Sequence, residues 1–102
     1  MTRHLLHYGI HFLLPILIAL WFYREQWVRV ALILLAGILL DLDHLWADSI
    51  FDPGRCSIGF HPLHSHWAIL GYCLLPFFKG TRIIGLALIH HIVADLLDCL
   101  LM

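Results

Sequence analysis

The stretch RIIGLALIHHIVADLLDCLLM, residues 82–102, decides the fold of this chain. It is apolar, and it is about as long as the roughly 20 residues that an α-helix needs to cross a bilayer. Inside it lie two imidazoles and two carboxylates, which are His90, His91, Asp95 and Asp98. Ionisable groups are costly and rare inside a membrane, so a span that carries four of them indicates a functional site.

The composition of the whole chain is also typical of a membrane protein. The chain has 102 residues, of which 62% are hydrophobic and 13% are charged, and its mean hydropathy is +0.89. A water-soluble domain of this length rarely has so few charged residues. The sequence therefore predicts a single integral membrane domain of the all-α class over residues 1–102.

Charge and cysteine content exclude several kinds of protein. The net charge is −1 and the six Lys and Arg residues are scattered, so no basic surface for nucleic acid is expected. The cysteines are Cys56, Cys73 and Cys99, an odd number without C-x-x-C spacing, and they predict neither a disulfide framework nor a thiolate zinc site. The nine histidines are the unusual feature, so histidine and aspartate must carry the chemistry.

Hydrophobic runs bounded by charged residues divide the chain into four predicted helices. They cover residues 4–23, 27–46, 63–78 and 82–101, and each is near the length of a membrane span. Short charged turns join the first helix to the second and the third to the fourth. We therefore expect an integral membrane four-helix bundle.

The basic residues predict the orientation of this bundle. Four lie in the two short turns, whereas Arg3 and Arg55 lie on the opposite side. Because positively charged residues are enriched on the cytoplasmic side, the short turns are expected to be cytoplasmic. Both termini and the long loop are then expected to face outward.

The polar residues of the four predicted helices share one depth. At about 1.5 Å per residue, every helix brings His or Asp to roughly 18 to 25 Å from the short turns. Residues three, four or seven apart share a helix face, and such faces can meet inside a bundle. The candidate metal ligands are His7, His11, Asp41, His44, His61, His64, His91 and Asp95.

Two nearby residues do not fit this pattern. In ideal helices Asp43 and His90 point away from the shared faces. Either the helix unwinds at DLDH, residues 41–44, or these side chains orient the ligands from behind.

The predicted ligand set favours particular metals. Imidazole and carboxylate without thiolate suit divalent zinc, manganese, iron or nickel better than copper(I) or an iron–sulfur cluster. The number of candidates allows one or two ions. Hydrogen bonding between His and Asp is the alternative that needs no metal. Taken singly, His4 could be interfacial, and Ser65 could be a helix N-terminal residue with a local hydrogen bond.

Three motifs resemble one known family. They are DLDH at residues 41–44, HPLHS at residues 61–65 and HIVAD at residues 91–95. In this order they are similar to the motifs of the YdjM-like family of bacterial inner-membrane proteins, which is described as metal-dependent hydrolases. Leu40 stands where that family has proline and Leu63 where it has threonine, so the chain resembles a shorter, diverged relative.

The resemblance implies a hydrolase of the bacterial inner membrane that depends on a divalent metal. Carried over by position, the implied residues are Asp41, Asp43, His44, His64, Ser65, His91 and Asp95. The resemblance covers about a sixth of the chain, and it favours a metal site more strongly than it favours a particular reaction.

Residue chemistry and the resemblance together favour a membrane-embedded metallohydrolase. A bound ion would lower the pKa of a water molecule and polarise a phosphoryl or carbonyl oxygen. Asp43 or Asp98 would act as general base or would orient a ligand, and Ser65 would contact substrate. The depth of the site favours a lipid or lipid-linked phosphate or ester as substrate.

Two other functions use the same residues. Intramembrane acids and histidines also relay protons or pass metal ions, so a transporter or sensor is the main alternative, and its four helices would favour a homo-oligomer. A haem protein with two axial histidines is the second alternative. Haem ligation, however, does not require so many carboxylates.

Overall fold

The computed structural model describes residues 2–46, 55–59 and 61–102. These residues form helices and turns, and no β-strand occurs among them. They make four continuous helical segments, which confirms the predicted all-α class. The segments are α1 (Thr2–Tyr8), η1 (Gly9–Leu13) and α2 (Leu14–Phe22); α3 (Trp27–Leu35) and η3 (Ala36–Trp46); α4 (His66–Leu74) and η5 (Leu75–Phe77); and η6 (Lys79–Thr81) with α5 (Arg82–Leu100).

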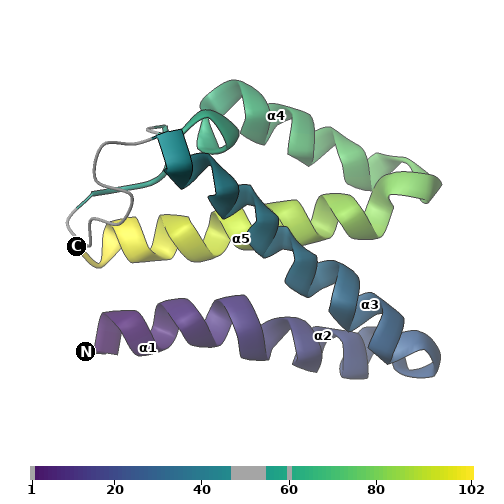
Figure 1. Ribbon diagram of the computed structural model, residues 1–102. Coiled ribbons are helices and arrows are strands. Elements are labelled where there is room, and N and C mark those ends of the chain that lie inside the picture. Colours follow the sequence, from purple (N-terminus) through teal and green to yellow (C-terminus); the bar gives the residue numbers. More distant parts are fainter. Residues whose placement is uncertain (1, 47–54, 60) are drawn as a thin grey trace.

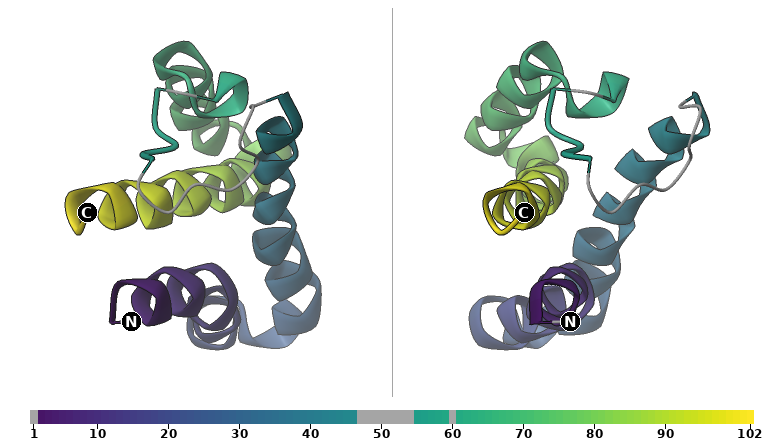
Figure 2. Two further views of the ribbon diagram at one scale, coloured as in Figure 1. Left: turned by 60° about the vertical axis from the view of Figure 1, so that its left-hand side comes forward. Right: turned by 90° about the vertical axis from the view of Figure 1, so that its left-hand side faces the viewer.

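Helix α5 is the central element of the fold, because it contacts α1, α3 and α4. The α1–α2 segment, α5 and α4 lie in one row, and the α3–η3 segment slants across one side of it (Figures 1 and 2). The beginning of α1 and the end of α5 lie at one end of the molecule, and both short turns lie at the other (Figure 1).

Small residues allow the helices to approach closely. A Cβ atom at Gly37 would lie 2.7 Å from the carbonyl oxygen of Ala87, and one at Gly85 would lie 2.6 Å from the Cβ of Leu75. Both distances are too short for real contacts, so glycine is required where η3 crosses α5 and where η5 packs on it. These two contacts fix the register of α5 against its neighbours.

Many large apolar side chains are exposed and several ionisable ones are buried beside an apolar core of Ala19, Val30, Ala31, Leu34 and Ala87. Large apolar residues such as Phe22, Leu32, Trp67 and Phe77 are exposed. Buried polar side chains are instead a large part of the interior: His11, Asp43, His61, His64, His91 and Asp95. Buried ionisable groups are rare in soluble proteins unless they are paired.

The third predicted helix differs from expectation. Residues 63–78 were expected to form one membrane span, but Pro62–His64 form the short 3-10 turn η4 and Ser65 is extended. The helix begins only at His66, and α4 and η5 comprise nine and three residues. At about 1.5 Å per residue they reach roughly 18 Å, which is shorter than a span. Pro62 and the capping Ser65 explain this late beginning.

Two of the described helices are long and apolar enough to cross a membrane. They are Thr2–Phe22, with a mean hydropathy of 1.8, and Lys79–Leu100, with a mean hydropathy of 1.9. The criterion is one of length and composition only.

A disulfide joins Cys56 to Cys99, with the two Cα atoms 5.1 Å apart. This disulfide shows that the prediction from cysteine number and spacing, which indicated no disulfide framework, was wrong. The two cysteines are separated by 43 positions in the chain, and only the fold brings the long loop to the end of α5. The third cysteine, Cys73, is free and exposed.

Candidate metal centre

Six predicted ligands come together between the α1–η1 segment, η3, η4 and α5. We call these residues the His/Asp cluster. Helix α1 and its continuation η1 contribute one histidine each, η3 contributes an aspartate, η4 a histidine, and α5 a histidine and an aspartate. The members are His7, His11, Asp41, His64, His91 and Asp95.

The first group in the cluster consists of Asp41, His64, His91 and Asp95. The Nε2 atom of His64 lies 2.8 Å from Oδ2 of Asp95 and 3.6 Å from Oδ1 of Asp41. The Nε2 atom of His91 lies 3.0 Å from Asp41 and 3.1 Å from Asp95. The four ligand atoms therefore face one common point.

The spacing of these atoms fits a metal ion. Zinc bonds to nitrogen and oxygen are about 2.0–2.1 Å long, so the ligand atoms of a tetrahedral site lie roughly 3.3 Å apart. The Nε2 atoms of His64 and His91 are 3.2 Å apart, and all the ligand atoms of the group lie within 4.8 Å of one another. The residues present therefore fit a divalent ion in donor type and spacing.

Asp43 holds His64 in the orientation that a metal ligand needs. Its Oδ2 atom accepts a hydrogen bond from Nδ1 of His64 at 2.8 Å and one from the backbone N–H of Leu63 at 2.9 Å. With Nδ1 as the donor to Asp43, Nε2 faces Asp41, Asp95 and His91, where it bears a proton or would bind a metal ion. A carboxylate behind a ligating histidine fixes its tautomer in this way.

The local backbone explains why Asp41 and Asp43 both reach His64. In an α-helix, residues two apart point about 160° away from each other, but in a 3-10 helix the angle is about 120°. Residues 36–46 form the 3-10 segment η3, so the two carboxylates lie on either side of the imidazole. Of the two possibilities that the sequence left open for Asp43, the irregular helix at DLDH is observed, and Asp43 is hydrogen-bonded to His64. Its role behind a metal ligand stays a prediction.

Three carboxylates also alter the proton affinity of His64. Burial opposes a charged imidazole, but hydrogen bonds to Asp41, Asp95 and Asp43 raise the pKa of His64 to about 10. The site therefore attracts positive charge strongly, whether that charge is a proton or a metal ion.

The second group in the cluster consists of His7, His11 and Asp95. The Nε2 atom of His11 lies 3.2 Å from Oδ1 of Asp95, and that of His7 lies 3.8 Å from the same oxygen. His11 is buried, whereas the side chain of His7 is 18% exposed. Each group therefore has one partly exposed member, which is His7 here and Asp41, with a side chain 33% exposed, in the first group.

A π-helical segment positions this second group. Within η1, the backbone N–H of Leu14 donates to the carbonyl oxygen of Gly9, an i to i+5 bond. By the same pattern the carbonyl of Ile10 would need an N–H at position 15, which is proline and has none. His90 supplies the donor instead, with Nε2 2.6 Å from that oxygen. His90 therefore holds η1 against α5.

Two further predicted ligands have different outcomes. The side chain of His44 lies outside the described part of the structure, so its predicted role stays a prediction. His61 is buried, with its ring centroid 5.8 Å from that of His64, but it belongs to neither group of described ligands. The sequence pattern indicated that His61 lies near the cluster, but it could not show whether His61 is itself a ligand or only a neighbour of one.

Two predicted catalytic residues have structural contacts. The hydroxyl of Ser65 accepts a hydrogen bond from the backbone N–H of Ala68 at 3.3 Å and caps α4, which is the local role that the sequence analysis weighed. Oδ1 of Asp98 lies 3.0 Å from Nε of Arg3, and this ion pair joins α5 to α1. Neither contact places the residue within the two ligand groups.

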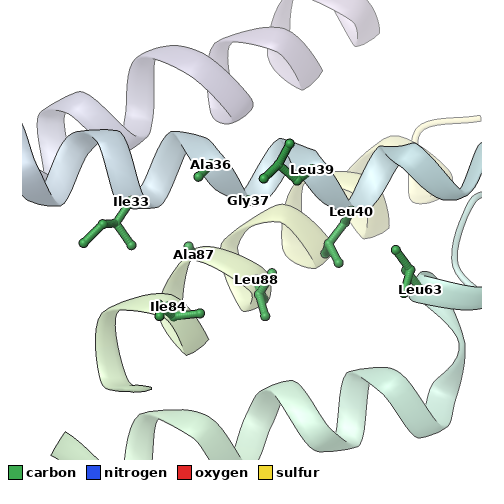
Figure 3. A pocket seen from close by; sticks show the side chains of 9 residues that line it. All are labelled: Ile33, Ala36, Gly37, Leu39, Leu40, Leu63, Ile84, Ala87 and Leu88. Carbon is green, nitrogen blue, oxygen red and sulfur yellow. The ribbon is translucent and has the colours of Figure 1, made fainter. Parts of the chain in front are cut away.

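An apolar groove lies between η3 and α5 (Figure 3). Its volume is about 350 Å³. Leu40 and Leu63 lie at one end of the row of lining side chains, and in the chain they directly precede Asp41 and His64. The other lining residues are Ile33, Ala36, Gly37, Leu39, Ile84, Ala87 and Leu88.

The chain belongs to a family of unknown function, DUF6122, whose model matches residues 1–102. No curated protein and no solved structure matches it.

Proposed function

We propose that this protein is a membrane-embedded enzyme that uses a divalent metal ion to hydrolyse a lipid or lipid-linked phosphate or ester. One observation carries the proposal. Asp41, His64, His91 and Asp95 come from three parts of the chain and direct four ligand atoms at one point. Lone pairs that face one another in a buried site require a proton or a cation between them.

The donor set restricts the choice of metal. It combines imidazole and carboxylate, and among the described residues both Cys56 and Cys99 are committed to a disulfide. Zinc, manganese and iron in their divalent states accept such ligands. Asp43 acts as a positioning residue for His64, because its Oδ2 atom already accepts two hydrogen bonds.

Two observations support membrane embedding. Large apolar side chains cover the surface, and two helices have the length and hydropathy of spans. A third observation concerns orientation. Disulfides persist in oxidising compartments such as the bacterial periplasm, so the Cys56–Cys99 disulfide favours an outward position for the end that carries the His/Asp cluster. The two short turns with their four basic residues lie at the opposite end (Figure 1).

Hydrolysis is the reaction that a metal site supports when water and substrate can reach it. A divalent ion supplies Lewis acidity, which lowers the pKa of a water molecule and polarises a phosphoryl or ester oxygen. The side chains of His64, His91 and Asp95 are 0%, 1% and 6% exposed, whereas that of Asp41 is 33% exposed. Water and substrate therefore approach this group from the side of Asp41.

The apolar groove supports a substrate with a hydrocarbon chain. It opens beside Leu40 and Leu63, next to two of the ligands (Figure 3). An acyl or prenyl chain in this groove would bring its head group to the His/Asp cluster. The motif resemblance to the YdjM-like family contributes the reaction class to this proposal.

Transport or sensing of a metal or of protons is the alternative. A conduit needs polar groups along its length, but residues 83–89 of α5 and 12–22 of the first helix are apolar or aromatic. This favours a site at one side of the membrane over a pathway across it.

The proposal is tested by metal analysis and hydrolysis together. The protein is purified in detergent, loaded with zinc, manganese or iron, and assayed for bound metal and for hydrolysis of phosphate- and ester-bearing lipids. We expect stoichiometric metal in the wild type, loss of metal and activity in His64→Ala, and retention of both in His4→Ala, which changes an exposed histidine of α1. Wild-type protein without metal would refute the site. Bound metal without hydrolysis of any lipid would favour sensing or transport.

A further inference from the structure

Asp95 belongs to both ligand groups, and its two oxygens face different partners. Oδ1 faces the Nε2 atoms of His11, at 3.2 Å, and of His7, at 3.8 Å. Oδ2 faces the Nε2 atoms of His64, at 2.8 Å, and of His91, at 3.1 Å. A carboxylate that served a single ion would not need histidines at both oxygens.

We propose that the His/Asp cluster is a two-metal centre in which the carboxylate of Asp95 bridges the ions, one at each oxygen. The inference rests on the proposed metal-binding function and deepens it. Two-metal hydrolytic sites hold their ions about 3.5–4 Å apart and stabilise both the attacking and the leaving oxygen.

The two positions differ in the number of protein ligands. The first has four, from Asp41, His64, His91 and Oδ2 of Asp95, whereas the second has three, from His7, His11 and Oδ1 of Asp95. Catalytic metal sites commonly have three protein ligands and an open position, whereas closed four-ligand sites are structural. The second position, with three protein ligands, is therefore the one with room for a water molecule or a substrate oxygen.

The charge of such a centre selects the substrate class. Two divalent ions carry four positive charges, and the carboxylates of Asp41 and Asp95 neutralise two of them. Asp43, behind His64, neutralises a third without contacting the centre. A net positive site in a low-dielectric environment favours an anionic substrate, so a phosphate ester of a lipid fits better than a neutral carboxylic ester.

The fold also holds the second position against α5. The hydrogen bond from His90 to Ile10 lies within the π-helical segment that carries His11. Single-turn π segments occur frequently at functional sites. His7 and His11 are four residues apart and share a helix face, and their ring centroids lie 4.4 Å apart.

Manganese stoichiometry and electron paramagnetic resonance test the bridge. Full-length wild-type protein in detergent is saturated with Mn²⁺, freed of excess ion and measured for manganese per chain and for spin coupling. We expect two ions per chain with an exchange-coupled spectrum. His11→Ala should retain one ion and lose the coupling, and Asp95→Asn should lose the coupling. The control His4→Ala should resemble the wild type.

The outcomes separate this inference from the proposed function. One ion per chain in saturated wild type, or two ions without coupling, would overturn the bridge and leave a mononuclear metal protein standing. No bound ion would overturn both. Because the wild-type spectrum alone decides between these results, a variant that fails to fold does not affect the conclusion. Phosphate adds a further readout: it should shift the wild-type spectrum and not that of His11→Ala.

Discussion

The contact between Asp43 and His64 shows how one side chain prepares the centre. Asp43 is completely buried and accepts the Nδ1 proton of His64 at 2.8 Å. A buried carboxylate is costly unless it is hydrogen-bonded, so its presence is best explained by the orientation that it imposes. The sequence left two possibilities for Asp43, an irregular helix at residues 41–44 or a position behind the ligands, and a helix of ideal geometry could not decide between them.

Replacing Asp43 tests this orientation. Asp43→Asn keeps the size of the side chain and removes its charge, so metal affinity should fall about 10- to 100-fold, as for other residues that support a ligand. Helicity should not change. The measurement is competition for zinc against a chelator, with circular dichroism as the control. Unchanged affinity would contradict the role of Asp43.

The pKa of His64 predicts a dependence of metal binding on pH. Because that pKa is raised to about 10, metal-free His64 is an imidazolium at pH 7.5, with protons on both nitrogens, and a metal ion must displace the proton on Nε2. Apparent affinity should therefore rise with pH by up to about tenfold per unit below pH 10. Zinc titrations in buffers of different ionisation enthalpy measure the released proton. Affinity that is constant between pH 6.5 and 8.5 would contradict this account.

At the scale of the element, irregular helices place the ligands. The π segment η1 and the 3-10 segment η3 each change the direction of the side chains that they carry. The sequence predicted the bounds of the first two helices closely, because hydrophobic runs set them. It could not predict these irregularities, since they depend on contacts such as that between His90 and Ile10. For the same reason the role of His90 was not apparent from helical periodicity.

The crossing of η3 and α5 offers a matched pair of substitutions. Gly37→Ala would bring a methyl group to 2.7 Å from the carbonyl oxygen of Ala87, so the helices must separate, at a cost of about 1–3 kcal/mol. Gly71→Ala in α4 meets nothing within 4 Å and should be neutral or stabilising by up to about 1 kcal/mol. Thermal unfolding in detergent compares the two. Equal stability would contradict the close packing.

At the scale of the molecule, the two ends have different chemistry. One end has the His/Asp cluster, the ion pair of Arg3 with Asp98 and the disulfide, and the other has the basic turns (Figure 1). The sequence could predict this difference between the two ends from the depth of the His and Asp residues in the helices and from the basic residues of the short turns. The disulfide could not be predicted, because cysteine spacing along the chain contains no information about a contact between positions 56 and 99.

Cysteine labelling tests the orientation of the whole molecule. In a Cys73→Ser background, Glu25→Cys in the turn after α2 introduces the one thiol outside the disulfide. An impermeant maleimide added to intact cells should leave it unlabelled, and permeabilisation should expose it, because the turn is proposed to be cytoplasmic. The Cys56–Cys99 disulfide should be intact in the same samples. Labelling before permeabilisation would contradict the proposed orientation.

X-ray absorption at the zinc edge of the loaded wild-type protein tests the central claim most directly, namely that the His/Asp cluster is a metal centre. We predict a shell of nitrogen and oxygen ligands at about 2.0–2.1 Å with the outer scattering of imidazole, and loss of the imidazole signal in a His64→Ala, His91→Ala double variant. A sulfur shell at about 2.3 Å, or a spectrum without imidazole scattering in the wild type, would contradict the account.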